Sequence, residues 1–145
     1  MPSSPLTVVA RHRYEAAPDR VFRAFTDPAL LTRWFSPAAE IAIEVLVHEL
    51  RPRGRYRFRY TQPSGERDVV TGEFCEISPP IRLAFTWTWE PPDHHAGIET
   101  LVTIELVADH GGTLVTVTHE RFPDEESRNR HDSGSTATLA RLVSQ

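Results

Sequence analysis

From Ile41 to Phe122 the apolar residues of this chain recur at every second position, in six separate stretches. A spacing of two puts alternate side chains on opposite faces of a β-strand, so each stretch predicts a strand with one apolar face. Turn-forming residues such as Pro63-Ser64-Gly65 and Pro79-Pro80 separate them. The predicted strands are Ile41–Leu50, Gly54–Gln62, Glu66–Ile77, Ile81–Trp89, Ile98–Asp109 and Thr113–Phe122. Such a succession, joined by short turns, predicts an antiparallel sheet.

The residues before this region predict one more strand and two short helices. Leu6–Ala16 is rich in β-branched side chains, which favour a strand. Pro18 and Pro28 each suit the first turn of a helix, and Asp27 is a good N-cap for the second helix. Each helix has one apolar face, formed by Val21, Phe22 and Phe25 in the first and by Leu30, Leu31 and Trp34 in the second.

The C-terminal residues 123–145 predict a helix. Asp124, Glu125 and Glu126 suit the positive end of a helix dipole, and Leu139, Leu142 and Val143 form an apolar stripe near the other end. An antiparallel sheet of this size has to cover its apolar face, so we expect this helix to pack into it. The predicted fold class is therefore α+β: a curved antiparallel sheet of about six to seven strands around a long C-terminal helix, with two short helices after the first strand.

Composition indicates an ordinary globular protein. Its 145 residues suit one domain over 1–145, with 39% hydrophobic and 25% charged residues. The net charge of −4 provides no general attraction for polyanions. The only cysteine, Cys75, cannot form an internal disulfide, which fits a reducing compartment. We find no secretory signal and no run of about 20 apolar residues, and we expect a cytoplasmic protein with no membrane span.

The stretch Arg55–Tyr60 alternates arginine with aromatic residues, a mixture that nucleic-acid-binding strands also use. In a strand, however, this alternation places the rings on one face and the arginines on the other. A base-stacking platform needs both on the same surface. We therefore predict no nucleic-acid binding, with the rings inside and the arginines facing solvent or glutamates of neighbouring strands.

Three segments resemble, in order, three blocks of one protein family: Tyr14–Pro37, Gly72–Glu90 and Gly111–Gly134. It is the family of homologues of the activator of heat-shock protein 90 ATPase, within the START-like (SRPBCC) helix-grip superfamily. The resemblance implies a sheet that grips the C-terminal helix, with an apolar cavity between them. The superfamily includes lipid carriers, polyketide cyclases, hormone receptors and chaperone activators, so the resemblance does not determine the function.

The sequence departs from the family at two places. Members usually carry Gly-Trp in the last helix, where this chain has Gly134-Ser135. The loss of that indole implies a wider cavity or a polar gap beside the helix. Arg53-Gly54 replaces the Gly-Gly that usually precedes the aromatic strand, which implies an altered turn.

Aromatic residues are the main candidates for the wall of a ligand cavity, although a closed core would use the same residues. Tyr56, Tyr60, Trp87 and Trp89 are of particular interest, because each carries a polar hydrogen that needs a partner when buried. The candidate cavity residues are Trp34, Tyr56, Phe58, Tyr60, Phe74, Phe85, Trp87, Trp89 and His119.

His119 shares a strand face with Val115 and Val117, so its imidazole is expected to point inward. It is either a buried histidine bonded to the protein itself or a polar anchor or proton carrier in the cavity. No catalytic residue is assigned. We expect no metal site, because His119-Glu120 lacks the second histidine of an H-E-x-x-H motif, and no cofactor, because no phosphate- or dinucleotide-binding signature occurs.

These observations leave several functional hypotheses. The first is a domain that binds a hydrophobic small molecule between the sheet and the last helix. The second, which the resemblance implies, is a co-chaperone-like partner of heat-shock protein 90 that stimulates its ATPase. A cyclase-like enzyme using the same cavity is a further alternative, with His119 and Tyr60 as the residues to test. A structural role without a ligand is also open.

Overall fold

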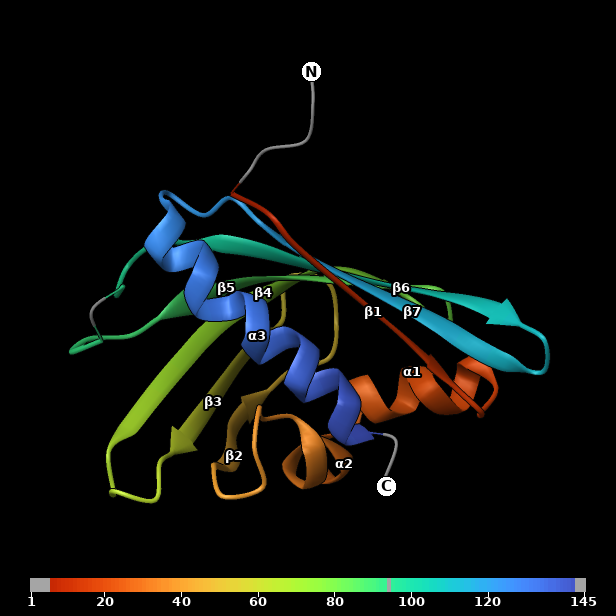
Figure 1. The fold of residues 1–145 in the computed structure, drawn as a ribbon, viewed down its shortest axis with the longest axis horizontal. Coiled ribbons are helices and arrows are strands. Elements are labelled where there is room, and N and C mark those ends of the chain that lie inside the picture. Colours follow the sequence, from red (N-terminus) through yellow and green to blue (C-terminus); the bar gives the residue numbers. More distant parts are fainter. Residues whose placement is uncertain (1–5, 94, 143–145) are drawn as a thin grey trace.

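Seven antiparallel strands form one curved sheet, and a long C-terminal helix lies across its concave side (Figure 1). The structure is a computed structural model and describes residues 6–93 and 95–142. The elements are β1 (Val8–Tyr14), α1 (Pro18–Thr26), α2 (Pro28–Trp34), β2 (Ala42–His48), β3 (Arg55–Thr61), β4 (Arg67–Ser78), β5 (Arg82–Trp89), β6 (Thr100–Asp109), β7 (Gly112–Glu120) and α3 (Glu125–Leu142). The predicted α+β fold class is confirmed.

The sheet order is β1-β7-β6-β5-β4-β3-β2, so the first strand lies beside the last one. The pairing Ala10↔Val117 puts small apolar side chains together on the inner face of these two strands. All other neighbours follow each other in sequence, as the short predicted turns require. No helix in the described part of the chain has the length and apolar character that crossing a membrane requires.

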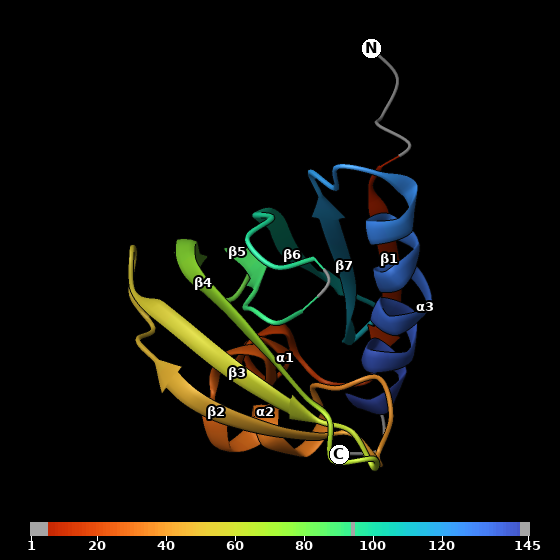
Figure 2. The same cartoon turned by 90° about the vertical axis from the view of Figure 1, so that its left-hand side faces the viewer.

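The two short helices begin where the prolines predict. Pro18 and Pro28 occupy the first turns of α1 and α2, and the Asp27 carboxylate accepts a hydrogen bond from the Ala29 N–H at 2.9 Å. The apolar face of α1 buries Phe22 and Phe25, and that of α2 buries Leu31 and Trp34. Helix α2 packs against β2, and α1 contacts β6 and β7, so together they cover one end of the sheet (Figure 2).

Helix α3 is held in place more by hydrogen bonds than by an apolar face. Among its side chains only Ser127 and Leu139 are fully buried, while Leu142 packs against the edge of the core; Val143 lies outside the described residues. The Tyr14 hydroxyl donates to the Leu139 carbonyl at 2.6 Å. Arg141 donates to the Ser36 carbonyl at 3.1 Å. The first bond fixes α3 beside β1, and the second joins the C-terminal turn of that helix to the segment after α2. The small residues of α3 face the rest of the concave surface without filling it.

The alternating stretch on β3 has its rings inside and its arginines outside, as predicted. Tyr56, Phe58 and Tyr60 are buried. Arg57 forms two hydrogen bonds of 2.8 Å with Glu90, and Arg59 pairs with Glu44 on β2. Arg57 and Arg59 are therefore held by acidic residues on the convex side.

The turn before β3 shows why Gly54 cannot carry a side chain. A Cβ on Gly54 would lie 1.9 Å from the Glu49 carbonyl oxygen, far inside contact distance. The preceding residue, Arg53, adopts a φ of 67°, a left-handed conformation that normally favours glycine. Arginine thus occupies the position where the family resemblance implies a glycine.

Candidate functional site

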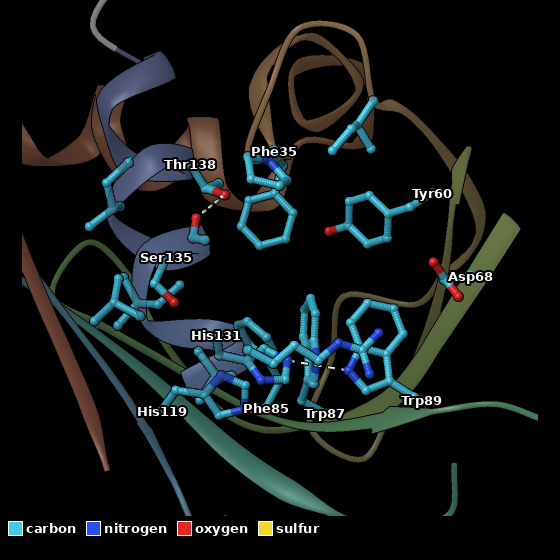
Figure 3. Close-up of a pocket in the computed structure, with 18 of the residues that line it drawn as sticks. Phe35, Tyr60, Asp68, Phe85, Trp87, Trp89, His119, His131, Ser135 and Thr138 are labelled. Atoms are coloured by element: carbon cyan, nitrogen blue, oxygen red, sulfur yellow. Dashed lines mark hydrogen bonds between the residues drawn. The ribbon is translucent and has the colours of Figure 1, made fainter. Parts of the chain in front are cut away.

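A pocket of about 310 Å³ lies between the concave face of the sheet, helix α3 and the segment that follows α2 (Figure 3). It exists because α3 rests on β1, leaving the inner faces of β3, β4 and β5 uncovered at this end of the sheet. Its lining residues are Phe25, Phe35, Pro37, Ile41, Tyr60, Gln62, Asp68, Phe85, Trp87, Trp89, Val102, Ile104, Val117, His119, Arg130, His131, Gly134, Ser135, Thr138 and Leu139. The wall is largely apolar, with a few polar groups distributed over it.

Five of the nine candidate cavity residues line this pocket. They are Tyr60, Phe85, Trp87, Trp89 and His119. Each lies on an inward-facing position of β3, β5 or β7. Their role in ligand binding stays a prediction.

The other four candidates, Trp34, Tyr56, Phe58 and Phe74, lie in the packed core next to the pocket. Trp34 is 1% exposed, and its indole N–H donates to the Ala24 carbonyl at 3.0 Å. The other three surround a void of only about 10 Å³. The reason is the position of α1 and α2, whose apolar side chains fill the concave space over this end of the sheet.

Tyr60 brings an unpaired polar group into the pocket. Its side chain is buried, and Figure 3 shows its hydroxyl pointing toward the interior of the pocket. That hydroxyl forms no hydrogen bond with any of the described residues, and its oxygen is open to the space of the pocket. Burial raises the pKa of Tyr60, so the phenol is neutral and can both donate and accept.

Trp87 brings a second one. It is 8% exposed, and its indole N–H has no hydrogen-bond partner in the described part of the chain. Buried N–H and O–H groups in native structures nearly always have a partner. The unpartnered Trp87 N–H therefore favours a bound molecule or water beside it as part of the functional state.

His119 points inward, as its position beside the valines predicts. Its Nε2 lies 2.7 Å from the Thr100 hydroxyl, which itself donates to the Trp87 carbonyl at 2.9 Å. Since a hydroxyl has one proton, Thr100 accepts from the imidazole, and His119 carries its proton on Nε2. Burial holds the pKa of His119 well below its ordinary value. The ring is neutral, and its Nδ1 keeps a lone pair.

His131, on α3, is a site residue that the sequence analysis missed. Its Nδ1–H donates to the Ser127 carbonyl at 3.0 Å, and its Nε2 accepts from the Trp89 indole at 3.2 Å. Burial lowers the pKa of His131 to about 4. Protonation of Nε2 would place two hydrogens against each other, so the neutral ring couples α3 to β5.

We expect His131 to make stability depend on pH between 7 and 5. Its pKa is about 4 in the folded protein and near 6.5 when unfolded. The unfolded state therefore takes up the proton first as the pH falls, which lowers the free energy of unfolding by about 2 kcal/mol from this residue. Urea unfolding at pH 7 and at pH 5 should show a smaller decrease in the free energy of unfolding for His131→Gln than for the unsubstituted protein. His110→Gln, at a side chain that is 91% exposed, serves as the control; equal losses in all three proteins would contradict the expectation.

Arg130 and Asp93 form an ion pair at the edge of the pocket. Two hydrogen bonds of 2.8 Å join the guanidinium to the carboxylate, and the pKa of Asp93 is lowered to about 2 by this contact. The guanidinium carbon also lies 4.4 Å from the centre of the Trp89 ring. The pair connects α3 to the loop between β5 and β6.

Asp68 is a carboxylate on the inner face of the sheet, also missed from the sequence. It is paired in register with Tyr60, and directly opposed residues point to the same side of a sheet. Burial, and then the charge of Asp93, raise the pKa of Asp68. The alternation that placed Phe74 inward applies equally to Asp68, six residues earlier, so the signal was present in the sequence.

Comparison with known proteins shows what the chain is similar to. Residues 15–144 match the family model described as "Activator of Hsp90 ATPase homolog 1-like protein". No curated protein matches the chain.

Several solved structures share the fold. A protein from Chromobacterium violaceum is 26% identical, with a TM-score of 0.84 over 97% of this chain and 96% of that one. An AHSA1 protein from Silicibacter pomeroyi is 25% identical, with a TM-score of 0.82 over 95% of each chain. A protein from Rhodobacter sphaeroides is 27% identical, with a TM-score of 0.78 over 97% of this chain and 89% of that one.

Proposed function

The chain belongs to the family of activator of Hsp90 ATPase homolog 1-like proteins, and on this premise we propose that it binds a hydrophobic small molecule in the pocket between its sheet and α3. The helix-grip arrangement supports the proposal, since the sheet and the last helix border a space that none of the described side chains fills. A volume of about 310 Å³ falls at the lower end of the range typical of small-molecule sites.

The observation that carries the proposal is the indole N–H of Trp87. This residue lines the pocket and is 8% exposed, and its buried N–H lacks a partner in the part of the chain that the structure describes. A buried polar group left this way in a closed core would destabilise the fold by about 1–3 kcal/mol. A ligand with a hydrogen-bond acceptor at this point removes that penalty, which supports binding over a purely structural role, and the Tyr60 hydroxyl offers the ligand a second polar contact.

The other hypotheses stay predictions. A cyclase-like enzyme would need an acid or a base at the pocket, and His119 with its Nδ1 lone pair is the residue to test. The co-chaperone hypothesis rests on the family alone, and no contact within the described residues favours it.

Two measurements test the proposed function. Native mass spectrometry of freshly purified protein, compared with a denatured sample, would detect a retained small molecule. A calorimetric titration with the neutral probe 2-naphthylmethanol would detect binding by an empty pocket. We expect a retained ligand or saturable binding; a clean mass together with no binding up to about 1 mM would overturn the proposal.

A further inference from the structure

We propose that the pocket selects ligands whose hydrophobic body ends in a protonated amine, that this end contacts Asp68, and that the pocket rejects carboxylates. This inference rests on the proposed function of the same pocket and adds the chemical class of the ligand. It follows from three features of the wall: a carboxylate without an ion pair, a guanidinium that is already engaged, and aromatic rings beside the carboxylate.

Asp68 is the carboxylate that faces the pocket. Its register partner on β3 is Tyr60, and both residues line the pocket wall. In the described part of the chain Asp68 forms no ion pair. Burial raises the pKa of Asp68, and its neighbour Asp93 raises it further through its charge and a side-chain hydrogen bond, while the charge of Arg130 acts in the opposite direction. A cation placed at Asp68 would stabilise the ionised carboxylate directly.

Arg130 has little capacity to hold an acidic ligand. Of the described residues that line the pocket, it alone has a permanent positive charge. Both of its terminal nitrogens are bonded to Asp93, and Nη1 also lies 2.8 Å from His95 Nδ1. The same guanidinium stacks on Trp89. A carboxylate ligand would therefore have to displace Asp93 to reach it.

The remaining titratable groups near the pocket do not change its preference for a cationic ligand. His119 and His131 are neutral at pH 7, because burial lowers the pKa of each. The two carboxylates of Asp68 and Asp93 outnumber the single positive charge of Arg130, so this region of the pocket is net negative. Glu126 lies on the same side, 3.3 Å from His95. Charge complementarity with such a wall favours a cation over an anion.

Aromatic rings flank the place where the amine would lie. Figure 3 shows the Asp68 carboxylate on the same side of the pocket as the rings of Tyr60 and Trp89, whose centres are 6.1 Å apart. Ammonium groups are attracted to the faces of such rings, and more strongly where water is excluded. The Tyr60 hydroxyl points away from Asp68 into the interior. It is left to bond a polar atom on the body of the ligand.

The test uses three probes that share a naphthalene body: 2-naphthylmethylamine, 2-naphthylmethanol and 2-naphthoate. At pH 7.5 we expect the amine to bind about tenfold more tightly than the alcohol, and the carboxylate about tenfold more weakly than the alcohol. This is the size expected for one charge–charge contact that solvent partly screens. In Asp68→Asn the amine should lose its advantage while the alcohol binds as before. The unchanged alcohol also shows that the variant is folded and its pocket intact.

Asp19→Asn is the matched control. It makes the same change of charge at an exposed position on α1, away from the pocket, and should preserve the order of the three probes. If the amine has no advantage, or if Asp68→Asn leaves that advantage intact, the inference about ligand class is overturned while the proposed function stands. If none of the probes binds up to about 1 mM, both are overturned.

Discussion

Ser135→Trp is expected to weaken the binding of 2-naphthylmethanol by on the order of a hundredfold, about 2.7 kcal/mol, while the protein stays folded. Ser135 lines the pocket from α3, and its neighbour Gly134 has open space around the position of a Cβ. An indole at position 135 has room to enter the pocket, where it would occupy the volume that the probe needs. The resemblance to the family implies tryptophan as the usual residue here, so α3 should accept it.

The control for this substitution is Thr136→Trp, which adds the same side chain one residue further along α3 on an exposed position. Calorimetric titration would measure the affinity of both variants, and circular dichroism their fold. We expect Thr136→Trp to bind the probe as the unsubstituted protein does. If Ser135→Trp bound the probe as tightly as the unsubstituted protein does, the probe would bind elsewhere.

Trp34→Ala is expected to lower the free energy of unfolding by about 3–5 kcal/mol. Trp34 is 1% exposed and makes edge-to-face contacts with Phe25 and Phe35, at 4.9 and 5.3 Å between ring centres. Its removal leaves a cavity between α1, α2 and the sheet. It also leaves the Ala24 carbonyl without its indole donor.

Urea unfolding would measure this loss, with Ile81→Ala as the reference. Ile81 is 59% exposed, so its truncation should change the free energy of unfolding by no more than about 0.5 kcal/mol. Because Trp34 does not line the pocket, folded Trp34→Ala should keep its affinity for the probe. A loss of stability below about 1 kcal/mol would contradict the packing of Trp34 in the core.

Much of the site could be predicted because strands impose a local rule. Alternation alone placed Tyr60, Trp87 and His119 on the inner face, and the structure has them there. The same rule applied to β4 would have added Asp68. Strand alternation could not predict Arg130 and His131, because both lie on helix α3. That helix carries only one buried apolar side chain, Leu139, so no periodic pattern indicated which of the polar residues on α3 face the sheet.

The amino-acid sequence by itself determined the strands, the two short helices and the side chains that point inward, since each depends on residues within a few positions of one another. Only the tertiary structure decided which inward rings belong to the core and which to the pocket wall. Helices α1 and α2 fill the concave face over one set of rings, whereas α3 packs against β1 and leaves the other set facing open space. It also decided the polar contacts of the wall. Arg130 meets Asp93 across 37 positions, and His131 meets Trp89 across 42. Contacts at such separations arise only when the chain has folded, and no local pattern specifies them.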